Sequence, residues 1–415
     1  MQTRLIPSFR DTPAGREAER ILRSCVHCGF CSATCPTYQL LGDELDSPRG
    51  RIYQIKRVLE GEPPSRRTQI HLDRCLTCRS CETTCPSGVH YGELLEVGRR
   101  QVEEAVKRPL KERIERRLAL TLLPYPRRFA ALLRVGRAFR PLLPKRLADK
   151  IPPTMPVPPP APAPQTKRHM LLLEGCVQPA LDPGINGATR NVLARLGIHL
   201  DSAAQAGCCG AMPQHLSNEA QALTMMRRNI DAWWPAIEAG AEAIVISASA
   251  CAVTVKEYGR LLRDDSHYRD RAARVSAMTR DLVEVLEQEP LGVLGHAPSG
   301  HPRVAFHAPC TLQHGEQLPG RVEVLLGRLG FQLTPVPDAH LCCGASGTYS
   351  LFQPEIAVRL RENKLAALQS GGPGLIASAN IGCLNDLRAV SPLPVVHWIQ
   401  LLESLTAPAA SAATD

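Results

Sequence analysis

The chain has 415 residues, of which 44% are apolar and only 4% aromatic, and its formal net charge is +9. That length provides for a substantial core divided between two or three domains. The N-terminus lacks the apolar segment of a signal peptide, and the longest apolar stretch, around residues 243–255, is too short to span a bilayer. We therefore expect a cytoplasmic protein whose sixteen cysteines stay reduced and bind metal, rather than a disulfide framework.

The N-terminal part is predicted to be mainly helical around two cysteine runs. Helices are expected over 16–24 and 49–59, and helical periodicity resumes over 91–123. The two runs are CVHCGFCSATCP (Cys25, Cys28, Cys31, Cys35) and CLTCRSCETTCP (Cys75, Cys78, Cys81, Cys85). Both follow C-x2-C-x2-C-x3-C-P, the pattern of bacterial ferredoxins that hold two clusters.

This pattern also predicts which thiols share a cluster. Three cysteines of a run bind one cluster, and the fourth, which precedes a proline, binds the other. One [4Fe–4S] cluster is thus assigned to Cys25, Cys28, Cys31 and Cys85, and a second to Cys35, Cys75, Cys78 and Cys81. Zinc also binds four thiolates, but usually through paired C-x2-C units, so the pattern favours iron–sulfur.

A basic stretch and then a proline-rich one follow the second run. The basic residues between Arg99 and Lys150 fit a solvated helix face, an anionic lipid surface or an acidic partner. No interleaved aromatic motif supports a nucleic-acid site, so none is expected. Prolines at 124, 126, 141 and 144 are expected to end the helical order. Residues 151–165 predict a semi-rigid polyproline spacer that pairs no backbone donors and marks the main domain boundary.

Beyond the spacer the chain repeats itself. Each copy has a lone cysteine, a Cys-Cys-Gly (CCG) motif and another lone cysteine: Cys176, Cys208, Cys209 and Cys251, then Cys310, Cys342, Cys343 and Cys383. Matching cysteines are 134, 134 and 132 residues apart, which indicates a duplication.

Each copy alternates strand-like and helix-like segments, which favours a parallel α/β sheet. Strands are expected over 169–176, 198–202 and 241–251 in the first copy, and over 303–310, 331–337 and 374–383 in the second. Helices are expected over 188–196 and 218–238. Every cysteine would then lie at or just past the carboxyl end of a strand, where open sheets bind ligands. Gly210 and Gly344 are expected to relieve crowding against a cluster.

Four stretches extend the pattern beyond the cysteines: RSCVHCGFCSATCPTYQLLGDELDSPRGRIY, HLDRCLTCRSCETTCPSGV, NIDAWWPAIEAGAEAI and HLCCGASGTYSL. With these, nearly the whole chain resembles the iron–sulfur subunits of bacterial glycolate oxidase. The expected fold is multidomain, a mainly helical ferredoxin-like domain and then two α/β CCG domains with parallel sheets. The expected bounds are 16–122 for the ferredoxin-like domain, 123–168 for the linker, and 169–300 and 301–405 for the CCG domains.

The resemblance implies one or two further iron–sulfur clusters on the CCG cysteines. Some proteins with CCG domains carry a fifth cysteine per copy and hold a noncubane cluster, but Ala248 and Asn380 stand at that position here. Four thiols per copy suffice for a cubane. Asn380 and His307 are open as unusual ligands of the second copy, although structural roles are favoured for both. Buried or redox-active thiols without metal remain the alternative.

The implied function is electron transfer within a flavin-linked glycolate dehydrogenase, an oxidoreductase acting on CH–OH groups. No catalytic residue is expected in this chain, because no G-x-G-x-x-G follows a strand and no substrate pocket is evident. FAD-containing subunits would oxidise the substrate, and a quinone or other acceptor would receive the electrons, with peripheral contact at the cytoplasmic face of the inner membrane. The alternatives are the corresponding subunit of a glycerol-3-phosphate or D-lactate dehydrogenase and, more distantly, a metal-binding scaffold or redox sensor.

Overall fold

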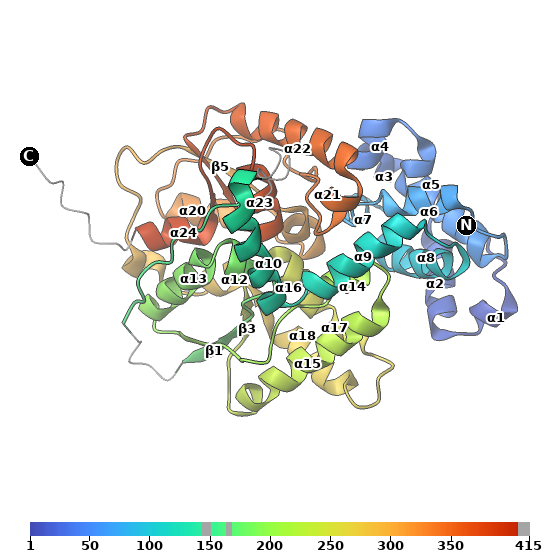
Figure 1. The fold of residues 1–415 in the computed structure, drawn as a ribbon, viewed down its shortest axis with the longest axis horizontal. Coiled ribbons are helices and arrows are strands. Elements are labelled where there is room, and N and C mark those ends of the chain that lie inside the picture. Colours follow the sequence, from blue (N-terminus) through green and yellow to red (C-terminus); the bar gives the residue numbers. More distant parts are fainter. Residues whose placement is uncertain (143–150, 163–167, 406–415) are drawn as a thin grey trace, which may run out of the picture.

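The computed structural model describes residues 1–142, 151–162 and 168–405. An N-terminal helical part lies at one end of the molecule, and the two CCG copies lie side by side at the other (Figure 1). The fold is mixed, with a helical ferredoxin-like part and two all-parallel sheets, which confirms the predicted fold class. Among the described residues, none of the helices combines the length and apolar character needed to cross a bilayer.

Short helices build the N-terminal part. They are α1 (Pro7–Arg10), α2 (Pro13–Ser24), α3 (Phe30–Ala33), α4 (Pro36–Leu41), α5 (Pro48–Leu59), α6 (Arg66–Asp73), α7 (Ser80–Thr83) and α8 (Tyr91–Ala105). Both helices predicted around the first run are present, as α2 and α5, and the predicted 91–123 helix is divided into α8 and α9 (Leu110–Leu122). Apolar side chains of α2, α5 and α8 form one buried core beneath the cysteine loops.

A buried charge network fixes the loop that connects α4 and α5. Asp46 is fully buried and accepts hydrogen bonds from Arg51 at 3.1 Å and Arg74 at 2.9 Å, while its Oδ1 lies 3.0 Å from Nδ1 of His71. The guanidinium groups of Arg51 and Arg74 compensate the negative charge of the buried Asp46 carboxylate. The four side chains therefore form a buried ion-pair network. Arg51 also donates to the backbone oxygen of His71 and to Thr37, which ties α5 to α6 and α4.

The basic and proline-rich stretch is more ordered than the sequence predicts. Pro126 begins a further helix, α10 (Pro126–Phe139), because the first turn of a helix does not need its missing N–H. The described part of the predicted spacer, 151–162, is extended, but it packs on the first CCG copy. The expectation that it pairs no backbone donor is wrong, because the Ala161 N–H donates to Asn191 Oδ1 at 2.8 Å.

The first CCG copy is a four-stranded parallel sheet in the order β2-β1-β3-β4. The strands are β1 (His169–Leu172), β2 (His199–Asp201), β3 (Ile244–Ile246) and β4 (Thr279–Asp281). The helices are α12 (Gln178–Leu181), α13 (Gly184–Arg195), α14 (Ala211–His215), α15 (Glu219–Glu238), α16 (Ser249–Lys256), α17 (Tyr258–Leu261), α18 (Arg269–Met278) and α19 (Leu282–Leu286). Trp233 of α15 is fully buried against this sheet.

The second copy is a three-stranded parallel sheet in the order β5-β6-β7. Its elements are β5 (Val304–His307), α20 (Arg321–Arg328), α21 (Tyr349–Phe352), α22 (Pro354–Gln369), β6 (Leu375–Ser378), α23 (Ile381–Arg388), β7 (Val395–His397) and α24 (Trp398–Ser404). The strand predicted over 331–337 is wrong. Only a single bridge from Leu333 to Val304 forms, because Pro335 and Pro337 lack the N–H groups that a ladder requires.

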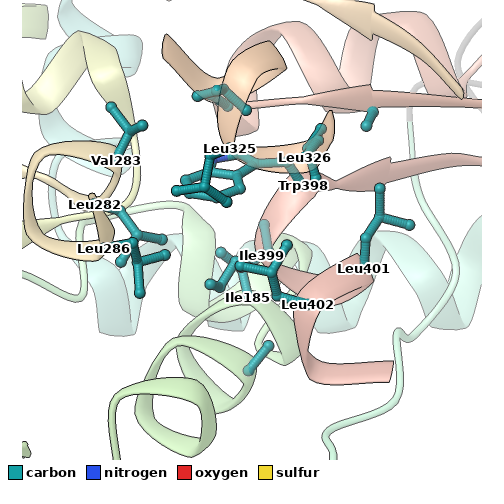
Figure 2. Packing of buried hydrophobic residues seen from close by; sticks show 14 of the residues in the cluster. Ile185, Leu282, Val283, Leu286, Leu325, Leu326, Trp398, Ile399, Leu401 and Leu402 are labelled. Carbon is teal, nitrogen blue, oxygen red and sulfur yellow. The ribbon is translucent and has the colours of Figure 1, made fainter. Parts of the chain in front are cut away.

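The two copies share one hydrophobic core. Helix α24, at the end of the second copy, packs on α13 of the first, with Ile399 and Leu402 close to Ile185 (Figure 2). Trp398 is fully buried in the same cluster, beside Leu325 and Leu326 of α20. This common core fixes the position of one sheet relative to the other, and with it the distance between their cysteines.

Candidate iron–sulfur sites

The first pocket of the N-terminal part, here called the outer site, collects thiols from both runs. Its lining includes Cys25, Cys28, Cys31 and Cys85. Cys28 is exposed, and the apolar side chains of Val26 and Phe30 on either side of it are 66% and 60% exposed. His27 and Gly29 have φ values of 56° and 88°, which curl the loop around the pocket.

The second pocket, the inner site, lies deeper. Its lining includes Cys35, Cys75, Cys78 and Cys81, together with the buried Arg51. Cys81 also borders the outer site, so the two pockets are adjacent. The Arg51 guanidinium places a positive charge where four thiolates would gather, which lowers the free energy of charging them.

In the first CCG site, the four thiols form a series in which each interacts with the next. Cys176 interacts with Cys208, Cys208 with Cys209, and Cys209 with Cys251. Their residues come from the loop after β1, the loop after β2 and the first turn of α16. The N-terminus of α16 therefore offers its partial positive charge to a thiolate at Cys251.

The second CCG site repeats this arrangement. Sγ of Cys310 lies 3.8 Å from Sγ of Cys342, and Cys343 interacts with both Cys342 and Cys383. Cys383 lies in the first turn of α23, as Cys251 does in α16. In both copies the backbone N–H of the glycine in the Cys-Cys-Gly motif donates to the sulfur of the first cysteine. The distance from N to Sγ is 3.5 Å both from Gly210 to Cys208 and from Gly344 to Cys342.

The placement of the CCG cysteines differs in part from the sequence expectation. Cys208 and Cys209 lie well beyond the end of β2, and the Cys342 pair follows no strand at all. Gly344 has a φ of 89°, and a Cβ there would meet the backbone oxygen of Ala357 at 2.7 Å. The need for glycine at this position therefore comes from the approach of α22.

Both CCG sites and the inner site open into one central cavity. The cysteines in its lining are Cys78, Cys176, Cys208, Cys209, Cys251, Cys310, Cys342 and Cys383. The Cys310 thiolate adds to burial in raising the pKa of Cys78 well above its usual value, so these two thiols of different domains are electrostatic neighbours. Charged side chains also line the cavity, Arg79, Arg99 and Glu257 among them.

The donor chemistry fits iron–sulfur clusters. Burial raises the pKa of the Cys31 thiol to about 11, and it raises the pKa of the Cys81 thiol well above its ordinary value. Free thiolates would be unstable in such pockets, whereas binding to a cationic metal core removes their protons and compensates their charge. Each of the four sites supplies four thiols, the number that a [4Fe–4S] cluster requires.

Comparison with known families agrees with the geometry. A 4Fe-4S dicluster domain matches residues 21–89, and a cysteine-rich domain matches twice, at 170–256 and 304–388. The first match covers both cysteine runs. Each of the other two contains all four cysteines of its copy.

Whole-chain relatives are also found. The glycolate oxidase iron–sulfur subunit of Escherichia coli (strain K12) is 55% identical over 97% of this chain and 98% of its own length. A probable glycolate oxidase iron–sulfur subunit of Bacillus subtilis (strain 168) is 29% identical, with 90% of each chain covered. The lactate utilization protein A of Geobacillus thermodenitrificans is 29% identical over 52% of this chain and 91% of its own.

The grouping of thiols in the two N-terminal pockets can be tested by pairs of serine variants. We expect Cys85→Ser to lose the same cluster as Cys28→Ser, and Cys35→Ser the same cluster as Cys78→Ser, with about four iron atoms lost per chain in each case. Iron analysis and the electron paramagnetic resonance spectrum of the remaining reduced cluster check this. If Cys85→Ser instead gives the spectrum of Cys78→Ser, each run binds its own cluster and the grouping is wrong.

Proposed function

The chain belongs to the family of glycolate oxidase iron–sulfur subunits, and from this premise we propose the path that electrons take through it. It is the iron–sulfur electron carrier of an oxidoreductase complex, so other subunits accompany it. We propose that an FAD-containing subunit delivers electrons at the outer site. They leave through the central cavity, where a quinone or another acceptor approaches the CCG sites.

The position of the inner site is the observation that carries this proposal. It borders the outer site through Cys81 and the central cavity through Cys78. Hydrogen bonds also fasten the second CCG copy to the loop of the inner site, from Ser346 Oγ to the Leu76 oxygen at 2.7 Å and from Tyr349 Oη to the Arg74 oxygen at 2.9 Å. A bound [4Fe–4S] cluster exchanges single electrons, and a reduced flavin can release its electrons one at a time.

The surface around the outer site supports docking of the flavoprotein there. Cys28 is exposed, the exposed apolar side chains of Val26 and Phe30 lie two residues to either side of it in the chain, and the exposed Tyr53 packs edge-on against its neighbour His27. An exposed apolar group beside an accessible redox site is a feature of protein–protein contacts. By contrast, the cysteines of the inner site are buried or half-buried.

The ligand assignments belong to this proposal. Cys25, Cys28, Cys31 and Cys85 would hold one cluster, and Cys35, Cys75, Cys78 and Cys81 the next. Cys176, Cys208, Cys209 and Cys251 would hold a third centre, and Cys310, Cys342, Cys343 and Cys383 a fourth. The corresponding domains are 16–122, 169–300 and 301–405, and 123–168 connects the first to the second. We propose glycolate as the substrate oxidised by the partner subunit, with D-lactate as the second candidate because lactate utilization proteins are among the relatives.

Two serine variants test the direction of electron flow. In a complex carrying Cys28→Ser, we expect glycolate to reduce the flavin but none of the remaining iron–sulfur absorption, because the first site in the path is lost. In Cys78→Ser, glycolate should reduce the flavin and the outer site. Reduction of the acceptor should be lost in both variants, while dithionite, which reduces exposed centres directly, serves as the control for cluster content.

The reverse result would contradict the direction. If glycolate reduces the inner and CCG centres in Cys28→Ser, and the CCG centres but not the outer site in Cys78→Ser, electrons enter at the CCG end. Full acceptor reduction in both variants would remove the ferredoxin-like sites from the path. D-Lactate, offered in place of glycolate, separates the two substrate candidates by the rate of flavin bleaching.

A basic helical pair supports peripheral contact with an anionic membrane surface at the cytoplasmic face. Helix α9 exposes Leu110, Ile114 and Leu118 at intervals of four residues, and α10 exposes Leu132, Val135 and Phe139. Exposed basic residues alternate with them: Lys111, Arg113, Arg117, Arg127, Arg128 and Arg134. Apolar rows flanked by Lys and Arg are typical of helices that lie in the interface of anionic lipid.

Binding to lipid vesicles tests this contact. We expect the wild-type chain to sediment with vesicles of phosphatidylglycerol and phosphatidylethanolamine, and the double variant Ile114→Glu, Leu118→Glu to bind more than about tenfold more weakly, because two apolar side chains no longer enter the interface. Val293→Glu with Val390→Glu, at exposed apolar positions elsewhere, is the matched control. Equal binding by the α9 variant and the wild-type chain would contradict the proposal.

A further inference from the structure

The two CCG copies differ in one way that their cysteines do not reveal. Three positions beside the thiols are polar in the second copy and apolar in the first. His307, Ser378 and Asn380 occupy the places that Leu173, Ile246 and Ala248 occupy in the first copy. His307, Ser378 and Leu173 are among the deeply buried residues, so the difference lies within the sites themselves.

His307 lies within reach of the same metal as two cysteines. A ring nitrogen of His307 and the sulfurs of Cys343 and Cys383 all lie within 4.8 Å of one another, and all three residues are buried. His307 is the last residue of β5 and pairs in register with Ser378, the last residue of β6. The parallel ladder therefore aims the imidazole at the thiols from the carboxyl edge of the sheet.

The hydrogen bonds of His307 suit a ligand. Its Nδ1 lies 2.9 Å from Oγ of Ser378, and the ring also interacts with the Cys343 thiol. Histidines that bind metal commonly donate their second ring N–H to a fixed oxygen, which sets the tautomer and the ring orientation. With Nδ1 donating to Ser378, Nε2 is the nitrogen that presents a lone pair to the site.

Asn380 adds a second asymmetry at the same site. Its Nδ2 donates to Sγ of Cys383 at 3.4 Å. Ala248, at the matching position, offers no such bond to Cys251. A hydrogen bond to a ligand sulfur and a neutral nitrogen ligand both raise the reduction potential of an iron–sulfur centre, because each stabilises the reduced form, which carries more negative charge.

We propose that the second CCG site binds its metal centre through a mixed set of ligands, with His307 Nε2 beside the cysteine thiolates, whereas the first binds through thiolates alone. The second site is then the more oxidising of the two and holds an electron in preference to the first. This inference rests on the proposed iron–sulfur occupancy of the second site.

The coupling of histidine nitrogen to the electron spin tests the inference directly. The complete chain would be purified anaerobically with and without ¹⁵N-labelled histidine, titrated with dithionite and measured by pulsed electron paramagnetic resonance. We expect one cluster signal to carry the coupling of a directly bound nitrogen, to change on labelling, and to appear at the higher potential. The nitrogen coupling should vanish in His307→Leu, which gives the second site the residue of the first, and the signal of this site should move to a lower potential, while the signals of the outer and inner sites persist and show that the chain has folded.

Two further variants separate the imidazole as a ligand from its hydrogen bond to Ser378. His307→Cys offers a thiolate in place of the imidazole, so the signal should lack nitrogen coupling and appear at a lower potential. Ser378→Ala leaves the imidazole but frees its Nδ1, so iron release from this site to a chelator should rise by about 10- to 100-fold. A His314→Gln variant is the matched control, because that imidazole bonds to Thr83 and to the backbone of His340, outside the thiol site.

The failures are distinguishable. If no paramagnetic state shows histidine coupling, or if only the weak coupling of a hydrogen-bonded nitrogen is found, the ligand assignment is wrong while the proposed function stands. If Cys342→Ser and the wild-type chain contain equal iron, the second site holds no cluster, and both the assignment and that part of the proposed function fall. Coupling that survives in His307→Leu also overturns the assignment.

Discussion

The whole structure depends on the burial of thiols that must become anions. A buried thiolate is stable only beside compensating positive charge, and the groups that surround the sites provide it. Arg51 lines the inner site, and helix N-termini and backbone N–H groups meet the CCG sulfurs. Because each pocket is lined by cysteines of separate segments, the chain brings remote loops together, and the helices and sheets serve to hold those loops in place.

Contact between domains follows from the same requirement. Electron transfer needs redox centres close together, so the ferredoxin-like part cannot be a freely tethered module. Ser346 and Tyr349 fasten the second CCG copy to the loop that carries Cys75 and Cys78. The common core around Trp398 fixes the first copy relative to the second. The described part of the proline-rich segment, residues 151–162, packs on the first CCG copy through contacts such as the hydrogen bond from the Ala161 N–H to the Asn191 side chain.

Local patterns in the sequence predicted more than its long-range geometry. Helices α2 and α5, the parallel sheets and the duplication were predictable, because cysteine spacing and apolar periodicity are local signals. The strand over 331–337 was mispredicted because Pro335 and Pro337 outweigh its apolar character. The placement of His307 beside Cys343, Ser378 and Cys383 was not predictable from local patterns, because those residues lie far from it along the chain. Comparing the two copies position by position, with Leu173 opposite His307, was the signal that could have revealed it.

We propose that this chain, an iron–sulfur electron carrier, takes its electrons from a flavoprotein that oxidises a 2-hydroxy acid. The most direct test of this proposal is an anaerobic affinity purification of the chain from its native cells, with the visible spectrum of the eluate recorded before and after glycolate is added. We expect flavin to elute with the chain and glycolate to bleach both the flavin and the iron–sulfur absorption. Elution without flavin, or flavin that bleaches while the iron–sulfur absorption stays unchanged, would contradict the proposal.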